Sequence, residues 1–184
     1  MRVALLASIA LLFATPASAA LAPGARAPDF TTRGARAGKI FTVHLADALK
    51  KGPVVLYFFP AAFTPGCSAE ARAFAAAIGD FKKAGATVIG MSADPVDVLA
   101  DFSKKDCAGQ FPVASAGAAI VKAYDVALGR QVLGKDGIPR AITNRTSYVI
   151  APDGSVLYAH SDANPADHVR NTLDVVQRYR TARK

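Results

Sequence analysis

The chain has 184 residues, a formal net charge of +8 at pH 7, 52% hydrophobic residues and 20% charged residues. That length and apolar content suffice for one domain with its own hydrophobic core. Lysine and arginine are scattered apart from a C-terminal cluster at 178–184, and no basic stripe with interleaved aromatic residues is present, so we attribute the charge to solubility and expect no nucleic-acid partner.

Residues 1–19 have the pattern of a secretory signal peptide. Arg2 gives a positive start, residues 3–14 are an apolar stretch, and Ala17-Ser18-Ala19 is a small-x-small cleavage site. The stretch is shorter than the roughly 20 residues that span a bilayer, and no later run reaches that length. We expect an exported, periplasmic protein with no membrane association once processed, residues 20–184 forming one domain; an uncleaved anchor is the alternative. In that compartment two cysteines form a structural disulfide or a redox pair.

Strand and helix patterns alternate through the first half of the mature chain. Residues 40–45 predict an N-terminal hairpin or an irregular strand, and residues 53–59 are an apolar run typical of a buried central strand. A helix follows and ends near 82–85. Residues 86–91 predict a second buried strand. The core face of the helix carries residues spaced i, i+4 and i+7, namely Phe74, Ile78 and Phe81.

The second half continues this alternation. Asp94 as N-cap and Pro95 at the first helical position predict another helix, with Val98 and Phe102 toward the core. A short helix is expected over 117–124, and strands 146–150 and 155–159 should form a hairpin around the turn at 152–154. The last helix should begin near 164–165, with Val169, Leu173 and Val176 inward. Strands separated by helices indicate a mixed α/β sheet with parallel pairs and a closing antiparallel hairpin.

The segment 60–67, Pro-Ala-Ala-Phe-Thr-Pro-Gly-Cys, places a cysteine in the first turn of a helix, just beyond the central strand. With Thr64 as N-cap, Pro65 is at N1 and Cys67 at N3, where a negative side chain is favoured. This position favours the thiolate, the nucleophilic form of cysteine. A helix N-terminus contributes on the order of 1 kcal/mol, whereas lowering an ordinary thiol pKa from about 8.5 to roughly 6 requires about 3.4 kcal/mol. A fixed cation should therefore lie nearby, unless Cys67 is a small buried core residue.

This segment resembles the peroxidatic motif of the peroxiredoxins, Pro-x-x-x-Thr-x-x-Cys. The Thr-Pro-Gly-Cys form followed by Glu70 is most similar to the bacterioferritin comigratory protein or peroxiredoxin Q group. The resemblance implies a thioredoxin-like mixed sheet flanked by helices on both faces, with an N-terminal hairpin. Other matching segments extend it over nearly all of the chain after residue 20, namely 27–30, 54–60, 90–94, 111–113 and 144–154.

The resemblance also implies a function, a thiol-dependent peroxidase that reduces hydrogen peroxide and organic hydroperoxides through a Cys67 sulfenic acid. It makes Arg145 the cation beside the thiolate and the peroxide oxygens, Thr64 a hydroxyl contact to the peroxide, and Pro60 a shield of the pocket. The alternatives are Arg140 or Arg72 as the cation, with Arg145 an ordinary strand-edge arginine, and Pro60 a plain strand terminator.

The resolving step departs from the commonest pattern of that group. Many members carry a resolving cysteine five residues after the peroxidatic one, where this chain has Arg72. Some relatives keep one in the region of Cys107, so the resemblance favours an intramolecular Cys67–Cys107 disulfide, recycled by a thioredoxin-like reductant. A one-cysteine cycle with Cys107 as bystander is the alternative. The polar segment 104–109, which ends in glycine, predicts a mobile and accessible Cys107 thiol.

Two other function classes are open. An exported thioredoxin-like disulfide oxidoreductase uses a Cys-x-x-Cys pair, and the upstream position here is Thr64. A non-enzymatic thiol or copper-binding module needs a second sulfur or histidine ligand, and none lies close to Cys67 in the sequence. The histidines, at 44, 160 and 168, match no zinc spacing, so we expect them to be structural or exposed, with no metal or other cofactor. The resemblance implies a monomer or weak dimer.

Overall fold

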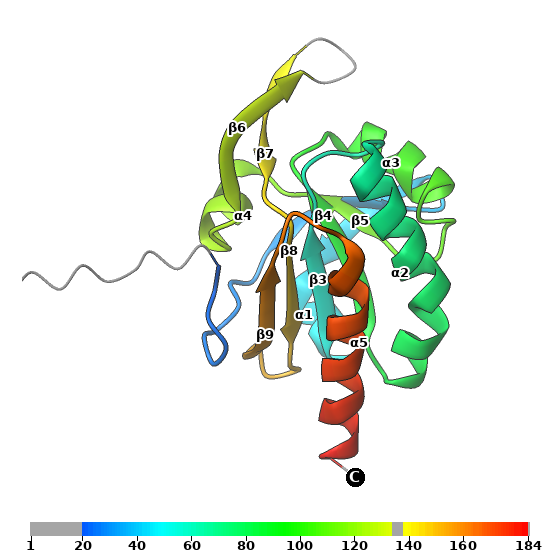
Figure 1. Ribbon diagram of the computed structural model, residues 1–184, viewed down its shortest axis with the longest axis vertical. Helices are drawn as coiled ribbons and strands as arrows, with labels where there is room; N and C mark the ends of the chain where they lie inside the picture. Colours follow the sequence, from blue (N-terminus) through cyan, green and yellow to red (C-terminus); the bar gives the residue numbers. More distant parts are fainter. Residues whose placement is uncertain (1–19, 134–137, 184) are drawn as a thin grey trace, which may run out of the picture.

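The computed structural model describes residues 20–133 and 138–183 (Figure 1). The predicted signal peptide, residues 1–19, lies outside the described residues and stays a prediction. In the part of the chain that is described, no helix is both long and apolar enough to cross a membrane.

A mixed β-sheet forms the centre of the fold. Within the described residues its strand order is β2-β1-β5-β4-β3-β8-β9, with β3 parallel to β4 and β4 parallel to β5. The other neighbours are antiparallel. The strands are β1 (Thr31–Arg36), β2 (Lys39–His44), β3 (Val54–Phe58), β4 (Thr87–Ser92), β5 (Val113–Ser115), β8 (Thr146–Ile150) and β9 (Val156–Ser161).

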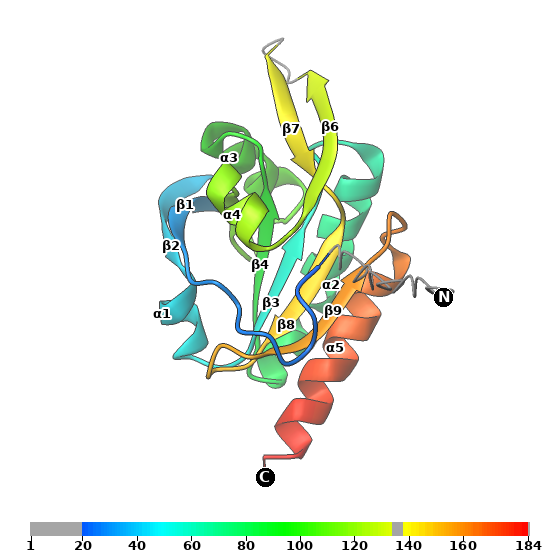
Figure 2. The ribbon, with the colours of Figure 1, turned by 90° about the vertical axis from the view of Figure 1, so that its left-hand side faces the viewer.

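Helices cover both faces of this sheet, as Figures 1 and 2 show. Successive side chains of a strand point to opposite faces, so Val55 and Tyr57 of β3 pack under α2, α3 and α5, whereas Leu56 and Phe58 face α1 and α4. Because β3 is buried on both faces, its sequence is a continuous apolar run. The helices are α1 (Leu45–Leu49), α2 (Pro65–Lys83), α3 (Val96–Lys105), α4 (Ala118–Ala123) and α5 (Ala166–Thr181).

The predicted mixed sheet with helices on both faces and an N-terminal hairpin is confirmed. The hairpin is β1–β2, the predicted short helix is α4, and the closing hairpin is β8–β9 with its turn at Gly154, where φ is 87°.

The start of α3 differs from its prediction. Pro95 is the N-cap, and the Asp94 carboxylate instead accepts hydrogen bonds from Ala62 N at 2.7 Å and Ser92 Oγ at 2.8 Å. The fully buried residue on the first turns of α3 is Leu99, and Val98 is half-buried.

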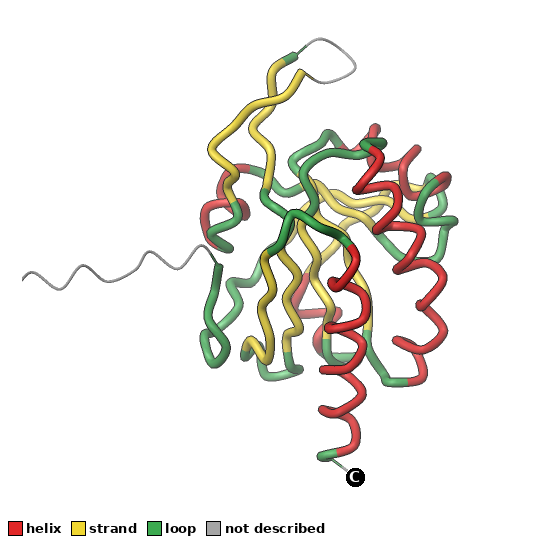
Figure 3. The backbone as a smooth tube through the Cα atoms, viewed as in Figure 1, coloured by secondary structure: helices red, strands yellow, loops and turns green. Residues whose placement is uncertain are grey.

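A second hairpin, between α4 and β8, was not predicted. It consists of β6 (Ala127–Leu133) and β7 (Pro139–Thr143), which pair with each other in a separate sheet and project beyond the main sheet (Figures 1 and 3). Every residue of β6 is exposed, so its sequence carries no alternation between buried and exposed positions. Arg140 lies on β7 of this hairpin.

Candidate active site

Cys67 lies in the first turn of α2, as predicted, at the carboxyl end of β3. The chain turns sharply between the two elements, and Phe63 has a left-handed backbone conformation with φ of 64°. Thr64 is the N-cap residue and Pro65 the first helical residue. By helix geometry the N–H groups of Gly66 and Cys67 have no acceptor within α2, and they create a positive electrostatic environment at the thiol. The Cys67 side chain is almost completely buried.

The Thr64 hydroxyl does not cap α2, which corrects the prediction for this side chain. It donates a hydrogen bond to the carbonyl oxygen of Ala61 at 2.9 Å, and it makes no bond to an N–H group of the helix. This bond closes the turn that contains Phe63. Since the hydroxyl proton is used in that bond, the oxygen lone pairs of the exposed Thr64 are left for an external donor.

Arg145 is the cation that contacts Cys67. It directly precedes β8, which is antiparallel to β3 with Thr146 opposite Phe58, so the register brings Arg145 to the start of α2. Its Nη2 donates to Cys67 Sγ at 3.5 Å, and its Nε donates to Ala163 O at 3.0 Å. A Cβ at Gly66 would lie 3.4 Å from the same Nη2, in ordinary van der Waals contact, so Gly66 lies next to this guanidinium group. Arg145 is 7% exposed.

Glu70 completes the site and was not among the predicted site residues. It lies three residues after Cys67 on α2, and its carboxylate forms an ion pair with Nη1 of Arg145. Both side chains are buried. Burial raises the pKa of Glu70 to about 7, against the opposing effect of Arg145. The other carboxylate oxygen, Oε1, is buried without a hydrogen-bond partner among the described residues. The sequence feature that could have identified Glu70 is its i+3 spacing from Cys67, which places both side chains on one face of the helix.

A buried histidine lies behind this pair. His168 of α5 accepts a hydrogen bond at Nδ1 from Ser147 Oγ at 2.8 Å, since its Nε2 is 3.0 Å from the carbonyl oxygen of Asp162 and must donate there. Its Nδ1 is 3.9 Å from Glu70 Oε1. Burial lowers the pKa of His168 to about 4, so the ring is neutral at pH 7. Arg145 is therefore the charged partner of Glu70.

The two rival arginines have other positions. Arg72, also on α2, forms an ion pair with Asp106 next to the second cysteine. Arg140 lies on β7 and lines a small cavity of about 160 Å³ together with Phe63 and Thr64. Among the described residues, the guanidinium group bonded to the Cys67 sulfur is that of Arg145.

Cys107 follows α3, and the prediction of an accessible thiol is wrong. Its side chain is 0% exposed and belongs to the same hydrophobic cluster as Cys67, Tyr57 and Phe102. Burial, and secondarily the charge of Asp106, raise the pKa of the Cys107 thiol well above its usual range. Both cysteines are free thiols. Lys104 and Lys105 are exposed whereas Asp106 is buried, and this polar sequence gave no indication that the thiol itself turns inward.

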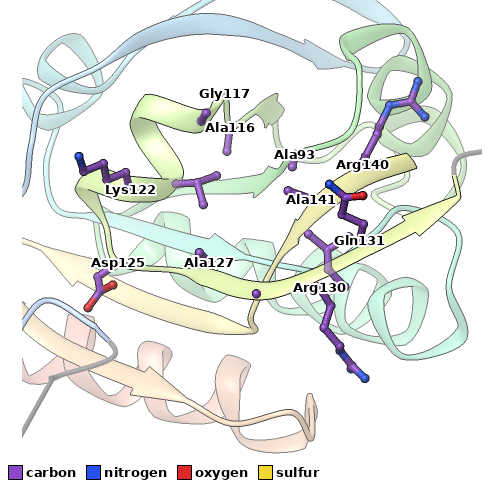
Figure 4. Close-up of a pocket in the computed structure, with 14 residues that line it drawn as sticks. Ala93, Ala116, Gly117, Lys122, Asp125, Ala127, Arg130, Gln131, Arg140 and Ala141 are labelled. Atoms are coloured by element: carbon purple, nitrogen blue, oxygen red, sulfur yellow. The ribbon is translucent and has the colours of Figure 1, made fainter. Parts of the chain in front are cut away.

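Cavities surround the site on the side of the β6–β7 hairpin. One, of about 470 Å³, reaches Pro60 and Arg145 and has an apolar wall from Leu128 and Ile142. It shares Ile142 and Arg130 with a larger cavity of about 700 Å³ beneath the hairpin, shown in Figure 4. The larger cavity has a floor of small residues such as Ala93, Ala116 and Gly117. Pro60 thus lies on the wall of the cavity that reaches Arg145, and its shielding role stays a prediction.

Comparison with known proteins identifies the family and the fold. The family model described as the AhpC/TSA family matches residues 23–159. Peroxiredoxin Q, chloroplastic, of Oryza sativa subsp. japonica is 32% identical over 159 residues, 84% of this chain; the chain spans 66% of the rice protein's length. Peroxiredoxin Bcp of Xanthomonas campestris pv. campestris is 34% identical over 124 residues, 65% of this chain and 73% of the relative. The crystal structure of peroxidoxin BcpB from Mycobacterium tuberculosis superposes with a TM-score of 0.71 at 29% identity, over 85% of this chain and 96% of that one, which confirms the thioredoxin-like fold.

Proposed function

Because the chain belongs to the AhpC/TSA family, the peroxiredoxins, we propose that it is a thiol-dependent peroxidase whose nucleophile is Cys67 and whose substrates are hydrogen peroxide and organic hydroperoxides. The contact between the Arg145 guanidinium and Cys67 Sγ carries this proposal. It supplies the fixed cation that a helix N-terminus alone cannot replace, at the place where a thiolate must be stabilised. The Arg145–Glu70 pair and the bond to Ala163 O hold that cation in position.

The chemistry follows from these charges. The Cys67 thiolate attacks the terminal oxygen of the hydroperoxide, so that an S–O bond forms while the O–O bond breaks. The cysteine sulfur is oxidised to the sulfenic acid and the peroxide is reduced, with the electron pair of the O–O bond leaving on the second oxygen, which then takes a proton from solvent to become water or an alcohol. Arg145 and the first N–H groups of α2 stabilise the charge that develops on the oxygens. The free lone pairs of the Thr64 hydroxyl can accept the O–H hydrogen of the peroxide.

The cavity beside Arg145 supports organic hydroperoxides as substrates. Its apolar residues, Leu128 and Ile142, can contact a hydrocarbon group, while the guanidinium faces the reacting oxygens. The alternative classes have less support. A disulfide oxidoreductase lacks its second cysteine, since Thr64 is on the loop at the upstream position. In the described residues, no cluster of three or more histidine, cysteine, aspartate or glutamate side chains is arranged to hold a metal ion.

We further propose that Cys107 resolves the sulfenic acid. Its thiol displaces the hydroxyl of Cys67 sulfenic acid, so that the S–S bond forms, the S–O bond breaks and water leaves; a thioredoxin-like dithiol then reduces the disulfide. The bridge requires Cα atoms within roughly 7 Å, and both thiols are buried in the reduced protein. The first turn of α2 and the turn that follows α3 must therefore open.

We also propose that the protein is exported to the periplasm, a proposal supported by the signal pattern of residues 1–19. We propose a monomeric or weakly dimeric state.

A mass-spectrometric experiment tests the cycle. After one equivalent of hydrogen peroxide, the wild type should lose two hydrogens as a disulfide, and Cys107→Ser should gain one oxygen on Cys67. Cys67→Ser should consume no peroxide with a dithiol reductant, because an unactivated hydroxyl cannot replace a thiolate. Peroxide turnover by Cys67→Ser would refute the nucleophile, and a stable sulfenic acid in the wild type would refute the two-cysteine cycle. Mass analysis of protein from the periplasmic fraction tests cleavage after Ala19.

A further inference from the structure

An ion pair joins the helix of Cys67 to the turn of Cys107. Arg72, five residues after Cys67 on α2, pairs through Nη1 with the carboxylate of Asp106, the residue immediately before Cys107. The Asp106 side chain is 11% exposed, whereas that of Arg72 is 62% exposed. The pair therefore spans from the surface to a largely buried carboxylate, and no role in the chemistry at Cys67 accounts for it.

The turn around Cys107 is tightly held in the reduced protein but contains strain. Asp106 is the C-cap of α3, and Ala108 then adopts a left-handed conformation with φ of 47°, which costs free energy for any residue with a Cβ. Gly109 N donates to Ser103 O at 2.9 Å, and Gly109 O accepts from Arg36 Nε at 3.0 Å. These bonds hold the Cys107 side chain inward, where it is 0% exposed.

Arg72 also belongs to the part of α2 that a disulfide must disturb. Cys67 is in the first turn, and Arg72 follows about one and a half turns later, at 3.6 residues per turn. Unwinding the helix far enough to release Cys67 from its buried position changes the backbone up to the neighbourhood of Arg72. The guanidinium group then loses its fixed position relative to Asp106.

We propose that Arg72 and Asp106 are positioning residues for the resolving step: their ion pair holds the Cys107 turn closed while α2 is intact and releases it when the start of α2 unwinds. This inference rests on the proposed two-cysteine cycle. It links the opening of the Cys67 turn with that of the Cys107 turn, since both thiols are buried in the reduced protein. It also keeps Cys107 from other oxidants until Cys67 has moved.

The thiol chemistry agrees with this order of events. In the closed turn, burial and the nearby Asp106 charge keep Cys107 as a protonated thiol with a raised pKa. Once the turn is exposed to solvent, the thiol can lose its proton to water, attack the Cys67 sulfur and displace hydroxide, which combines with that proton. No further oxidant or reductant is needed for this step.

The accessibility of Cys107 tests the proposal without peroxide. In a Cys67→Ser background, alkylation of Cys107 by iodoacetamide proceeds through the open turn, so its rate reports the open population. Arg72→Ala should raise that rate about five-fold, which corresponds to about 1 kcal/mol, the upper end for a partly exposed ion pair. Arg72→Lys should recover most of the protection. The control is Arg170→Ala, which removes an exposed pair with Asp167 on α5 and should leave the rate unchanged. An alkylation rate within two-fold of the parent in Arg72→Ala would overturn the proposal.

A second measurement separates this proposal from the proposed function. With Cys67 present and one equivalent of hydrogen peroxide, Arg72→Ala should form sulfenic acid at the wild-type rate and the disulfide about five times faster. Normal sulfenic acid formation with an unchanged disulfide rate would overturn the role of Arg72. If no variant forms sulfenic acid, the proposed function fails, and the alkylation rates still decide whether the ion pair holds the turn closed. A rise in disulfide formation matched by Arg170→Ala would also count against the proposal.

Discussion

Replacing Arg145 with methionine removes the group on which the proposed chemistry depends most. Methionine has a similar length and no hydrogen-bond donor, so the change deletes the bond to Cys67 Sγ, the ion pair with Glu70 and the bond to Ala163 O, while it fills most of the same space. The loss concerns the transition state more than the resting state, because the charge on the peroxide oxygens develops as the O–O bond breaks.

The magnitude follows from comparable sites. Removal of one preorganised donor to a developing oxyanion slows a reaction by about 10²–10³-fold, or about 2.7–4 kcal/mol. A buried carboxylate left without its partner would cost about 3–5 kcal/mol of stability if it stayed charged. Here burial already raises the pKa of Glu70 to about 7 with Arg145 present. Without Arg145 the carboxyl should take up a proton at pH 7, and the fold should therefore persist.

The assay must not depend on tryptophan fluorescence, since the chain has no tryptophan. Competition with horseradish peroxidase for hydrogen peroxide gives the second-order rate constant of Cys67 oxidation. We expect Arg145→Met to be at least about 100-fold slower than the wild type, with Arg170→Met, an exposed arginine on α5, as the matched control. A rate within three-fold of the wild type would exclude Arg145 as the partner of the thiolate and make Arg140 the next candidate.

Thr64→Val should slow the peroxide reaction about ten-fold or more, because it removes the lone pairs left free by the bond to Ala61 O; a wild-type rate constant would remove Thr64 from the site. Glu70→Gln should isolate the effect of the buried carboxyl on stability. The pKa of Glu70 is about 7 in the folded state and 4.5 ordinarily, so between these pH values the folded state keeps a proton that the unfolded state has released. The wild type should therefore lose stability relative to Glu70→Gln as the pH rises. The difference between their unfolding free energies should fall by at most about 3 kcal/mol from pH 4.5 to 7. Urea titrations across that range would contradict this if the difference were constant or rose. Tyr57→Phe removes a buried hydroxyl that has no hydrogen-bond partner among the described residues, so the unfolding free energy should be unchanged or up to about 1 kcal/mol higher; a marked loss would reveal a partner.

Several features were predictable because they depend on neighbours in the chain. A continuous apolar run predicts a strand buried on both faces, and β3 is one. The Thr64-Pro65-Gly66 approach predicts a helix start, and α2 begins there with Cys67 in its first turn. The predicted N-cap of α3, Asp94, lies one residue before the observed N-cap, Pro95. The cause is a tertiary contact, because the Asp94 carboxylate accepts a hydrogen bond from Ala62 N, on the loop before α2, instead of capping its own helix.

The β6–β7 hairpin shows the limit of pattern analysis. Burial patterns arise only where one side of an element faces the core, and β6 faces solvent along its whole length. Its position is set by bonds at its base, where Asn144 N donates to Val126 O and Thr143 Oγ1 donates to Phe59 O. Those bonds also bring the chain to Arg145, so an element without a sequence signal helps to place the cation that contacts Cys67.

The sequence by itself determined that Cys67 lies in the first turn of a helix that follows a buried strand, because helix starts and buried strands depend on residues within a few positions of one another. It also indicated that a cation must lie near Cys67, since a helix terminus alone is too weak. The tertiary structure decided which cation that is, what holds it and where the second thiol points. Arg145 reaches Cys67 through the antiparallel register of β8 on β3, Glu70 becomes its partner because both are excluded from water, and Cys107 is turned inward by packing against β3 and α2. These contacts join residues far apart in the chain, and their strength depends on burial, which no local spacing encodes.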